Sequence, residues 1–460
     1  MNGLSSALET ASSALGAYSQ ALGVDESNIA NASTPGYAAQ RANIAPLNTP
    51  GNDSAAADTV TMTSGSDAFA DALVRAASSQ ASASQTNAEQ LTPINEQFDI
   101  TGQTGILAAF QQFSKAFASL AVTPNDATAG SIAVRAAGQV ASAFQNVAAS
   151  LDTQKQQVAT RIQDAALNIN DLAANIAQLN AQAAASQQEI PSVAAGLRND
   201  LNQLSNLVDI TVSTNANGTV SVLAGGQLPL VLGDQAYTLS VDANAAPGSQ
   251  VRSSAGGNSP ETFSGRLGAL LDTQNNTIAA LIGGNGQAGS LNTLAAGFAM
   301  LVNTALANGT TPTGQPGSPI FTYGLNDAAR TLALVPNVTA SDLGLASAAQ
   351  SNGVANYLAA LPGSTAAGDQ IAGFSAEGYF GAIASSVGQQ LSDANTASTA
   401  NQTALTTAQS NWQQQSGVSL DQEAINVTGF ERSYQANAQV VSILNQLTAD
   451  TINIIPPTAG

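Results

Sequence analysis

Residues 2–37 read NGLSSALETASSALGAYSQALGVDESNIANASTPGY, and the interpretation of the chain starts from this stretch. Apolar side chains recur in it every seven residues, with others in the steps between, which predicts one helix with a narrow apolar stripe. The members of this stripe are Leu4, Leu8, Ala11, Leu15, Tyr18, Leu22 and Ile29. A helix over residues 4–30 would be roughly 40 Å long and could not bury its stripe alone.

A second helix with the same repeat is predicted at the other end of the chain. Its register is carried by Leu420, Val427, Tyr434, Val441 and Ile455. At its start, Ser419 and Gln422 have the spacing of a capping box, in which the glutamine amide reaches back to the cap. Each helix taken alone could be an ordinary domain helix. Taken together, they predict that the termini pair with each other and then pack against copies of the chain.

The first helix ends in a short motif. Asn31 tolerates the left-handed conformation that closes helices. Thr34-Pro35-Gly36 is typical of a turn, because proline fixes φ and glycine supplies a positive φ, and Tyr37 then begins an extended stretch. The motif consists of Asn28, Ile29, Ala30, Asn31, Thr34, Pro35, Gly36 and Tyr37.

The composition narrows the classes of function. Charged residues make up 9% of the 460 residues, against about 25% in ordinary soluble proteins. The net charge of −19 disfavours nucleic acid and anionic membranes as partners. The chain has no cysteine and no histidine, so the commonest general base and metal ligand is missing. We therefore expect no catalytic residues, no metal and no cofactor.

The N-terminus gives no sign of a cleavable signal peptide. Met1-Asn2-Gly3 contains no basic residue, and the leucines that follow are spaced helically instead of forming an apolar block. The chain also has no run of about 18 apolar residues, so we expect no membrane span. These features predict a cytoplasmic protein or one exported without cleavage.

The middle of the chain changes from helical to mixed patterns. Periodic apolar residues predict helices over 68–90, 105–120 and 127–185, and one starting at Pro191. Alternation after Asp209 predicts strands over 210–212, 220–222, 228–232 and 237–241. Helical patterns follow over 263–282 and 291–307, and again from about 376.

The predicted fold is mainly α, with an inserted α+β domain. It consists of paired N- and C-terminal coiled-coil helices, a long helical stalk and a strand-containing outer domain. The predicted units are a terminal assembly domain (1–45 and 411–460), a stalk (46–208 and 363–410) and an inserted outer domain (209–362).

Two stretches that could suggest chemistry have simpler explanations. Gly283-Gly284-Asn285-Gly286 lacks the Gly-Lys-Ser/Thr ending of a phosphate-binding loop, so a flexible link is favoured. Asp25 and Glu26 are adjacent and point from different helix faces, which favours a solvated turn over a shared substrate site.

Several strings resemble known flagellar sequences. The motif at 28–37 resembles the N-terminal signature of flagellar rod, hook and hook-associated proteins, and Tyr-Gln-Ala-Asn-Ala at 434–438 resembles a further string of these axial proteins. Ser-Gly-Val-Ser-Leu-Asp-Gln-Glu at 416–423 is similar to the C-terminal signature of the hook-associated protein 1 (FlgK) family. Gly429 inside the last helix and residues 340–375 depart from that family's pattern.

The resemblance implies a structural component of the bacterial flagellum that joins hook to filament. It implies type III export to the outside of the cell without cleavage. The implied partners are copies of the chain, the hook protein below, the next hook-associated protein above, and an export chaperone at the C-terminal helix. The implied C-terminal assembly residues are Ser419, Leu420, Val427, Tyr434, Ala438, Val441 and Ile455. The exposed stripes further predict termini that are disordered in the monomer and helical in the assembly.

Two alternatives remain. A hook or rod axial protein would share the terminal motifs, but the long stalk helices and the string at 416–420 argue against it. An extracellular hydrolase or lyase would need a convergent carboxylate pair, and the acidic residues of 209–362 form no recognisable motif.

Overall fold

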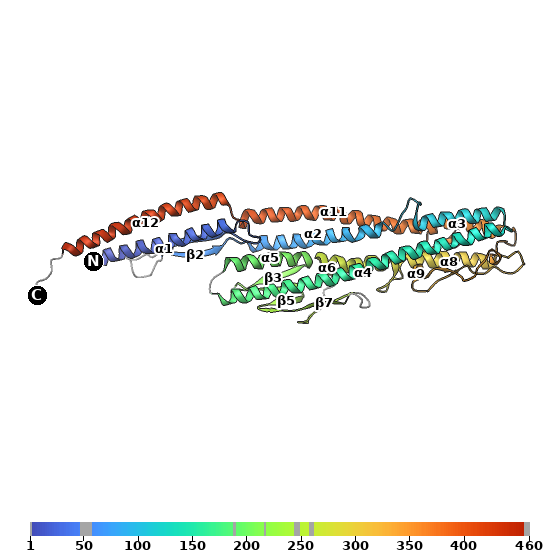
Figure 1. The fold of residues 1–460 in the computed structure, drawn as a ribbon, viewed down its shortest axis with the longest axis horizontal. Coiled ribbons are helices and arrows are strands. Elements are labelled where there is room, and N and C mark those ends of the chain that lie inside the picture. Colours follow the sequence, from blue (N-terminus) through green and yellow to red (C-terminus); the bar gives the residue numbers. More distant parts are fainter. Residues whose placement is uncertain are drawn as a thin grey trace.

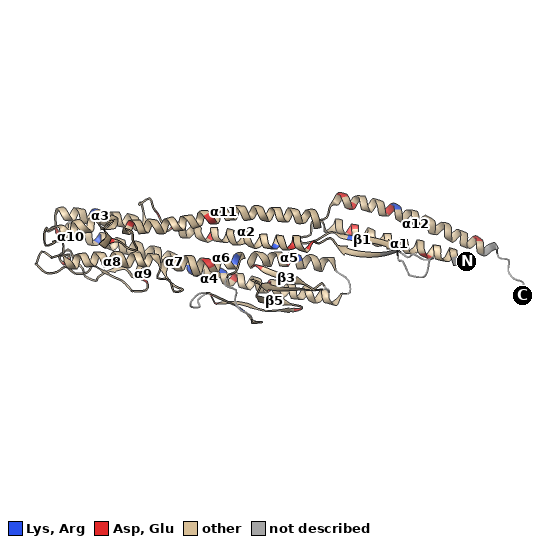
Figure 2. Cartoon of the chain, turned by 180° about the vertical axis from the view of Figure 1, so that it is seen from behind, with Lys and Arg blue, Asp and Glu red and all other residues tan. Residues whose placement is uncertain are grey.

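The protein is a long rod of helices with both termini at the same end (Figure 1). The computed structural model describes residues 2–46, 58–186, 190–215, 218–242, 249–256 and 262–454. Charged residues are spread thinly along the described part of the rod (Figure 2). The expected fold class, mainly α with paired terminal helices and a strand-bearing insert, is confirmed.

The terminal end of the rod is a pair of antiparallel helices. α1 (Asn2–Asn31) runs toward the stalk, and α12 (Leu420–Ile454) returns beside it (Figure 1). A hairpin of β1 (Gln40–Pro46) and β2 (Asp58–Ser64) also packs on α1. Both helices are formed within a single chain, which differs from the expectation of disordered ends. The reason is that α1 finds partners in the same chain, namely α12 and the hairpin.

The stalk consists of long helices that lie side by side. α2 and α11 form one layer, and α3, α4 and α5 pack against it or against each other (Figure 1). Their bounds are α2 (Ala68–Asn95), α3 (Gly105–Val122), α4 (Ala127–Ala185), α5 (Pro191–Leu207) and α11 (Ala376–Ser416). The helices predicted over 68–90, 105–120 and 127–185 are thus confirmed, the first two with longer C-terminal ends.

The helix starts follow local chemistry. Asp67 caps α2 by accepting hydrogen bonds from the backbone N–H groups of Phe69 and Ala70, at 2.8 and 3.1 Å. Asp126 caps α4 in the same way, and Pro191 occupies the first turn of α5, where its missing N–H costs nothing. Side-chain caps satisfy donors that a helix leaves unpaired.

One hydrophobic core runs through the stalk and the inserted segments. Phe298 of the insert packs between two stalk phenylalanines, with ring centroids 4.8 Å from Phe110 and 5.3 Å from Phe113. On α4, the apolar residues that step by four and three along the predicted helix are buried at Val158, Ile162, Ala165, Ile169 and Ile176 and half-buried at Leu172, Leu179 and Ala183. The buried residues of the terminal pair do not belong to this core.

The inserted region carries short antiparallel sheets and small helices. The strands are β3 (Ile210–Thr214), β4 (Val220–Ala224), β5 (Leu228–Leu232), β6 (Gln235–Ala236), β7 (Leu239–Asp242), β8 (Gln250–Ser253), β9 (Phe321–Thr322) and β10 (Ala333–Leu334). The first four form one sheet in the order β3-β4-β5-β6, and the others pair as β7-β8 and β9-β10. Asn180 of α4 fixes the larger sheet, because its Nδ2 donates to the Val220 carbonyl at 2.7 Å and its Oδ1 accepts from the Val220 N–H at 2.8 Å.

Small helices complete the insert. They are α6 (Gly265–Asp272), η1 (Thr273–Ile278), α7 (Ala279–Ile282), α8 (Ser290–Asn308), α9 (Ala328–Thr331), η2 (Ala340–Asp342), α10 (Gly353–Ala360), η3 (Leu361–Gly363) and η4 (Ala367–Asp369). The helix predicted over 263–282 is therefore interrupted by the π-helical turn η1. The strand predicted over 237–241 starts later than expected, since β7 begins at Leu239 and β6 ends before the predicted range, at Ala236.

Contrary to the expectation of no membrane-length apolar segment, α8 is long and apolar enough to cross a membrane, by length and composition alone. It spans 19 residues with a mean hydropathy of 1.3. Leu291, Leu294, Phe298, Val302 and Leu306 on this helix are fully buried in the shared core. Its apolar character is explained by this packing.

Candidate assembly site at the paired termini

The buried face of α1 consists mostly of small side chains. The buried face of α1 is covered by α12 and the hairpin, and we call its apolar members the alanine seam: Ala11, Ala14, Ala17, Ala21 and Val24. Tyr18 of α1 and Phe430 of α12 add an aromatic contact, with ring centroids 6.2 Å apart. Small residues let two helices approach closely, and the leucines of α1 stay outside this buried face.

The predicted leucine stripe lies at the edge of this seam. Leu4, Leu8, Leu15, Tyr18 and Leu22 are half-buried, and Ile29 is 41% exposed. Of the predicted stripe, only Ala11 is fully buried. The large side chains of α1 therefore keep apolar surface available beside the pair.

On α12, the predicted register is divided between the pair and the solvent. Val427, Ala438 and Val441 are half-buried, whereas Leu420 and Tyr434 are 55% and 40% exposed. Ile455 lies outside the described residues.

The predicted capping box at the start of α12 forms only in part. Ser419 accepts a hydrogen bond from the Gln422 N–H at 3.4 Å. The Gln422 amide does not reach back to the cap, because it donates to Asn426 at 3.0 Å instead.

A second apolar surface lies on another face of α12. Four large side chains there are 44–65% exposed, and their separations are close to whole helical turns. We call this set the outer stripe: Ile425, Val440, Ile443 and Leu447. Exposed apolar side chains that share one face mark a contact surface more often than single ones do.

The motif after α1 is built around the side chain of Asn28, which is fully buried. Its Nδ2 donates to the Gln40 carbonyl at 2.8 Å and to Glu423 Oε2 at 3.1 Å. Its Oδ1 accepts from the Gln40 N–H at 2.8 Å and from the Tyr37 hydroxyl at 2.9 Å. All four hydrogen-bonding positions of the amide are used, so Asn28 ties α1, the hairpin and α12 together.

The rest of the motif forms the predicted turn. Asn31 Nδ2 donates back to the Ser27 carbonyl at 2.8 Å, and the Thr34 hydroxyl donates to Asn31 Oδ1 at 3.3 Å. The Tyr37 N–H then closes the turn on the Thr34 carbonyl at 3.1 Å. Ala30 and Pro35 are exposed and contribute backbone shape.

Gly36 is the point where the motif meets the stalk. Its φ of +76° is rare for other residues, and a Cβ there would lie 2.5 Å from the Ala195 carbonyl oxygen of α5. Arg198 of α5 donates to the Gly36 carbonyl at 2.7 Å and to Ser64 Oγ at 3.3 Å. The turn is therefore both shaped and fastened against α5.

A further set of contacts continues this joint across the stalk. Asp71 of α2 lies 3.7 Å from Arg198 Nε and accepts a 2.6 Å hydrogen bond from the indole N–H of Trp412. Ser416, at the end of α11, accepts from the Ala39 N–H at 2.9 Å through its carbonyl and from the Asp67 N–H at 3.1 Å through its hydroxyl. No sequence pattern points to Arg198 or Asp71, because their partners are distant along the chain.

Asp25 corrects the sequence interpretation. It was expected in a solvated turn, but it is 4% exposed and faces Glu423 of α12, which is 6% exposed. Burial, and next the hydrogen bond and the charge of Glu423, raise the pKa of Asp25 to about 7. Adjacent Glu26 is exposed as expected.

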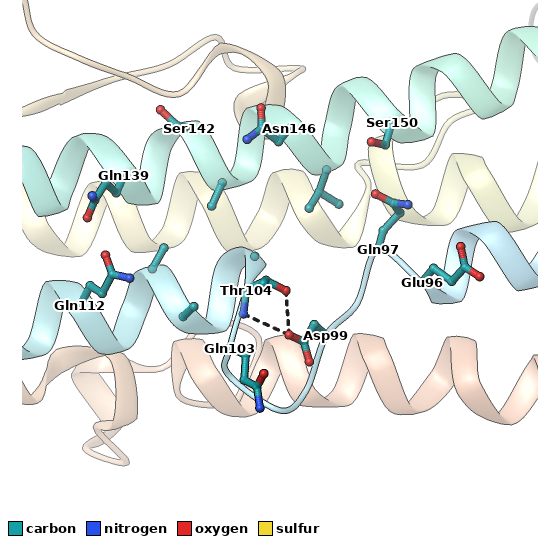
Figure 3. Close-up of a pocket in the computed structure, with 15 residues that line it drawn as sticks. Glu96, Gln97, Asp99, Gln103, Thr104, Gln112, Gln139, Ser142, Asn146 and Ser150 are labelled. Atoms are coloured by element: carbon teal, nitrogen blue, oxygen red, sulfur yellow. Dashed lines mark hydrogen bonds between the residues drawn. The ribbon is translucent and has the colours of Figure 1, made fainter.

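The stalk contains a polar cavity of about 490 Å³ beside the α2–α3 loop (Figure 3). Amide and hydroxyl groups line it, including Gln97, Gln139 and Asn146. Asp99 at its edge accepts hydrogen bonds from Thr101 and Thr104, which lower its pKa to about 2. A carboxylate held ionised in this way is suited to shaping the loop and poorly suited to proton transfer. Across the described ranges, no three acidic residues gather as a metal site would require.

The fold and the terminal site define a class: a rod-shaped assembly subunit whose two ends form one helical pair. Models of the flagellar rod families match both ends, "Flagella basal body rod protein" at residues 8–37 and "Flagellar basal body rod FlgEFG protein C-terminal" at residues 409–454. The model of the flagellar hook-associated protein FlgK helical domain matches residues 91–321, half of the chain. The chain belongs to the FlgK family of flagellar hook-associated proteins, and it is a structural protein of the hook–filament junction.

Individual relatives agree with this assignment. Flagellar hook-associated protein 1 of Bacillus subtilis (strain 168) is 26% identical over 500 aligned residues, which cover 97% of each chain. The solved structure of the flagellar hook junction protein FlgK from Burkholderia pseudomallei superposes with a TM-score of 0.64 at 16% identity. It covers 76% of this chain and all of the other, and at that identity it speaks for the fold alone.

Proposed function

We propose that this chain assembles with copies of itself through the outer surfaces of the paired termini. The observation that carries the proposal is the outer stripe of α12, whose four large apolar side chains are 44–65% exposed in the single chain. Burying one such side chain against a neighbour contributes about 1.5–3 kcal/mol. The half-buried leucine edge of α1 supplies a second surface on the same end of the rod. The neighbours of the assembled ring would be the hook protein below and the next hook-associated protein above.

The experiment is complementation of a strain that lacks this gene. Ile443→Asp places a charge in the outer stripe without touching the alanine seam. The matched control is Leu167→Asp on α4, where the side chain is 62% exposed but lies on the stalk. The control should restore filaments. Ile443→Asp should leave hooks without filaments and release filament protein to the medium, and normal filaments with this variant would contradict the proposal.

The three-unit division stays part of this proposal. The terminal unit (1–45 and 411–460) would make the ring contacts, the stalk (46–208 and 363–410) would set the length of the subunit, and the insert (209–362) would face outward. The separation of the terminal seam from the main core supports the first boundary. The role of the chain would be structural and not catalytic.

Export is the second part of the proposal. The chain would leave the cell by the flagellar type III route without cleavage, because the assembly helix itself lies at residues 4–30. Mass spectrometry of protein from sheared flagella should recover peptides covering Leu4 to Leu15. A chaperone would bind the C-terminal helix before export, and deletion of 411–460 should abolish that binding. Unchanged chaperone binding after this deletion would contradict it.

A further inference from the structure

Two buried carboxyl groups face each other at the base of the terminal pair. Asp25 comes from α1 and Glu423 from the first turn of α12, and they are 4% and 6% exposed. Asp25 Oδ2 receives no N–H or O–H donor from any residue that the structure describes. Ionised carboxylates are acceptors only, so the hydrogen bond between these two side chains requires a proton on one of them.

Within the part of the chain that the structure describes, the surroundings of the two carboxyls supply amides and no cation. Asn28 Nδ2 donates to Glu423 Oε2 at 3.1 Å, and Asn426 of α12 hydrogen-bonds to Asp25. The other charged groups that the structure describes on these elements are all exposed: Glu9 and Glu26 of α1, Asp421, Glu431, Arg432 and Asp450 of α12, and Arg41 of β1. The side chain of Asp58 on β2 lies outside the described residues, and the Tyr37 hydroxyl is committed to Asn28. Loss of the shared proton would therefore leave two like charges in a buried interface.

We propose that Asp25 and Glu423 form a proton-dependent latch that holds α1 against α12. With one proton shared, the two carboxyls join the helices. With both carboxyls ionised, they repel each other across the seam and the base of the pair opens more often. Both carboxyls lie within one folded chain, so the latch can be tested without any assembly partner and does not depend on the proposed function.

The sign of the pH dependence follows from the raised pKa of Asp25. An unfolded aspartate titrates near 3.8, and in the folded pair the pKa is about 7. The stabilisation is complete below the unfolded value and is lost as the pH rises toward and through the folded value. Between pH 6 and pH 8, this linkage predicts about a tenfold rise in the equilibrium constant for opening the pair.

The test is hydrogen exchange followed by mass spectrometry on the full chain at pH 6 and pH 8, with exchange times scaled for the intrinsic chemical rates. Peptides from α1 and α12 near the latch should show about tenfold less protection at pH 8, while stalk peptides should not change. Asp25→Asn, which cannot ionise and can donate to Glu423, should remove this pH dependence. Glu26→Gln is the matched control and should retain it.

Three results would overturn the latch. They are equal protection of the wild-type pair at both pH values, an unchanged tenfold difference in Asp25→Asn, and a pair that is unprotected at either pH. If Asp25→Asn fails to fold, Glu423→Gln supplies the same test, because it also removes one member of the carboxyl pair. A retained pH dependence in that variant would then refute the proposal.

Discussion

Replacing Asn28 with alanine should separate the terminal helices while leaving the stalk folded. The side chain is fully buried and makes four hydrogen bonds. Its loss leaves the N–H and C=O groups of Gln40, which is itself buried, without these partners. Each buried polar group left unpaired costs about 1–3 kcal/mol, so the two groups together cost about 2–6 kcal/mol.

The significance of this cost depends on what holds the pair together. Four alanine methyl groups and the three side-chain carbons of one valine make up the alanine seam, and at about 0.8 kcal/mol per buried carbon group they contribute roughly 6 kcal/mol. The cost of Asn28→Ala is of the same size as this whole contribution. The variant should therefore shift the pair from mostly closed to substantially open.

Hydrogen exchange of the full chain measures this directly. Peptides from α1 and from the start of α12 should lose protection in Asn28→Ala, and peptides from α4 should keep theirs. Asn31→Ala is the matched control, since Asn31 is only half-buried and its main bond, to the Ser27 carbonyl, is local. If Asn28→Ala kept wild-type protection in α1, the assignment of Asn28 as the tie between the three segments would be wrong.

Three further predictions concern the joint and the core. Gly36→Ala should lower the free energy of unfolding by about 1–3 kcal/mol, because Gly36 has a positive φ and lies against α5. Gly23→Ala, which has open space around it, should be neutral or stabilising by up to about 1 kcal/mol. Calorimetry of the two variants measures the difference. Phe298→Ala should destabilise the shared core by about 3–5 kcal/mol in denaturant unfolding, and a loss below about 1 kcal/mol would contradict a single core. Arg198→Lys removes the guanidinium group that donates to both the Gly36 carbonyl and Ser64. Small-angle scattering should then show a wider range of angles between the terminal pair and the stalk. An unchanged scattering profile would argue against this joint.

The helices were largely predictable from the sequence because their signals are local. Asp67, Asp126 and Pro191 mark helix starts by chemistry that acts within one turn. The apolar residues of α4 are periodic over many turns, so its helix could be predicted with its observed bounds. The interruption after α6, a π-helical turn over Thr273–Ile278, was not predicted.

The candidate site was predictable only in part. The motif from Asn28 to Tyr37 and the turn at Gly36 were found, because their residue types are unusual together. Asp25 was misplaced, because the sequence does not show that Glu423, almost four hundred positions later, lies opposite it. Arg198 and its partner Asp71 were missed for the same reason.

The seven-residue repeat of α1 predicts a helix that packs against another helix through its leucines. In the single chain, however, the leucines of α1 are only half-buried. Ala14, Ala17 and Ala21 occupy the buried face of α1, which α12 and the hairpin cover, and Leu8 and Leu15 remain at its edge. If the leucines filled the seam, the pair would gain about 1.5–3 kcal/mol for each one, and little apolar surface would remain for a neighbour. A seam of alanines gives a pair that is closed but only modestly stable. Leaving the leucines out of the seam makes the single chain less stable. The same leucines are then available to be buried against a neighbour, so the larger gain in free energy comes on assembly.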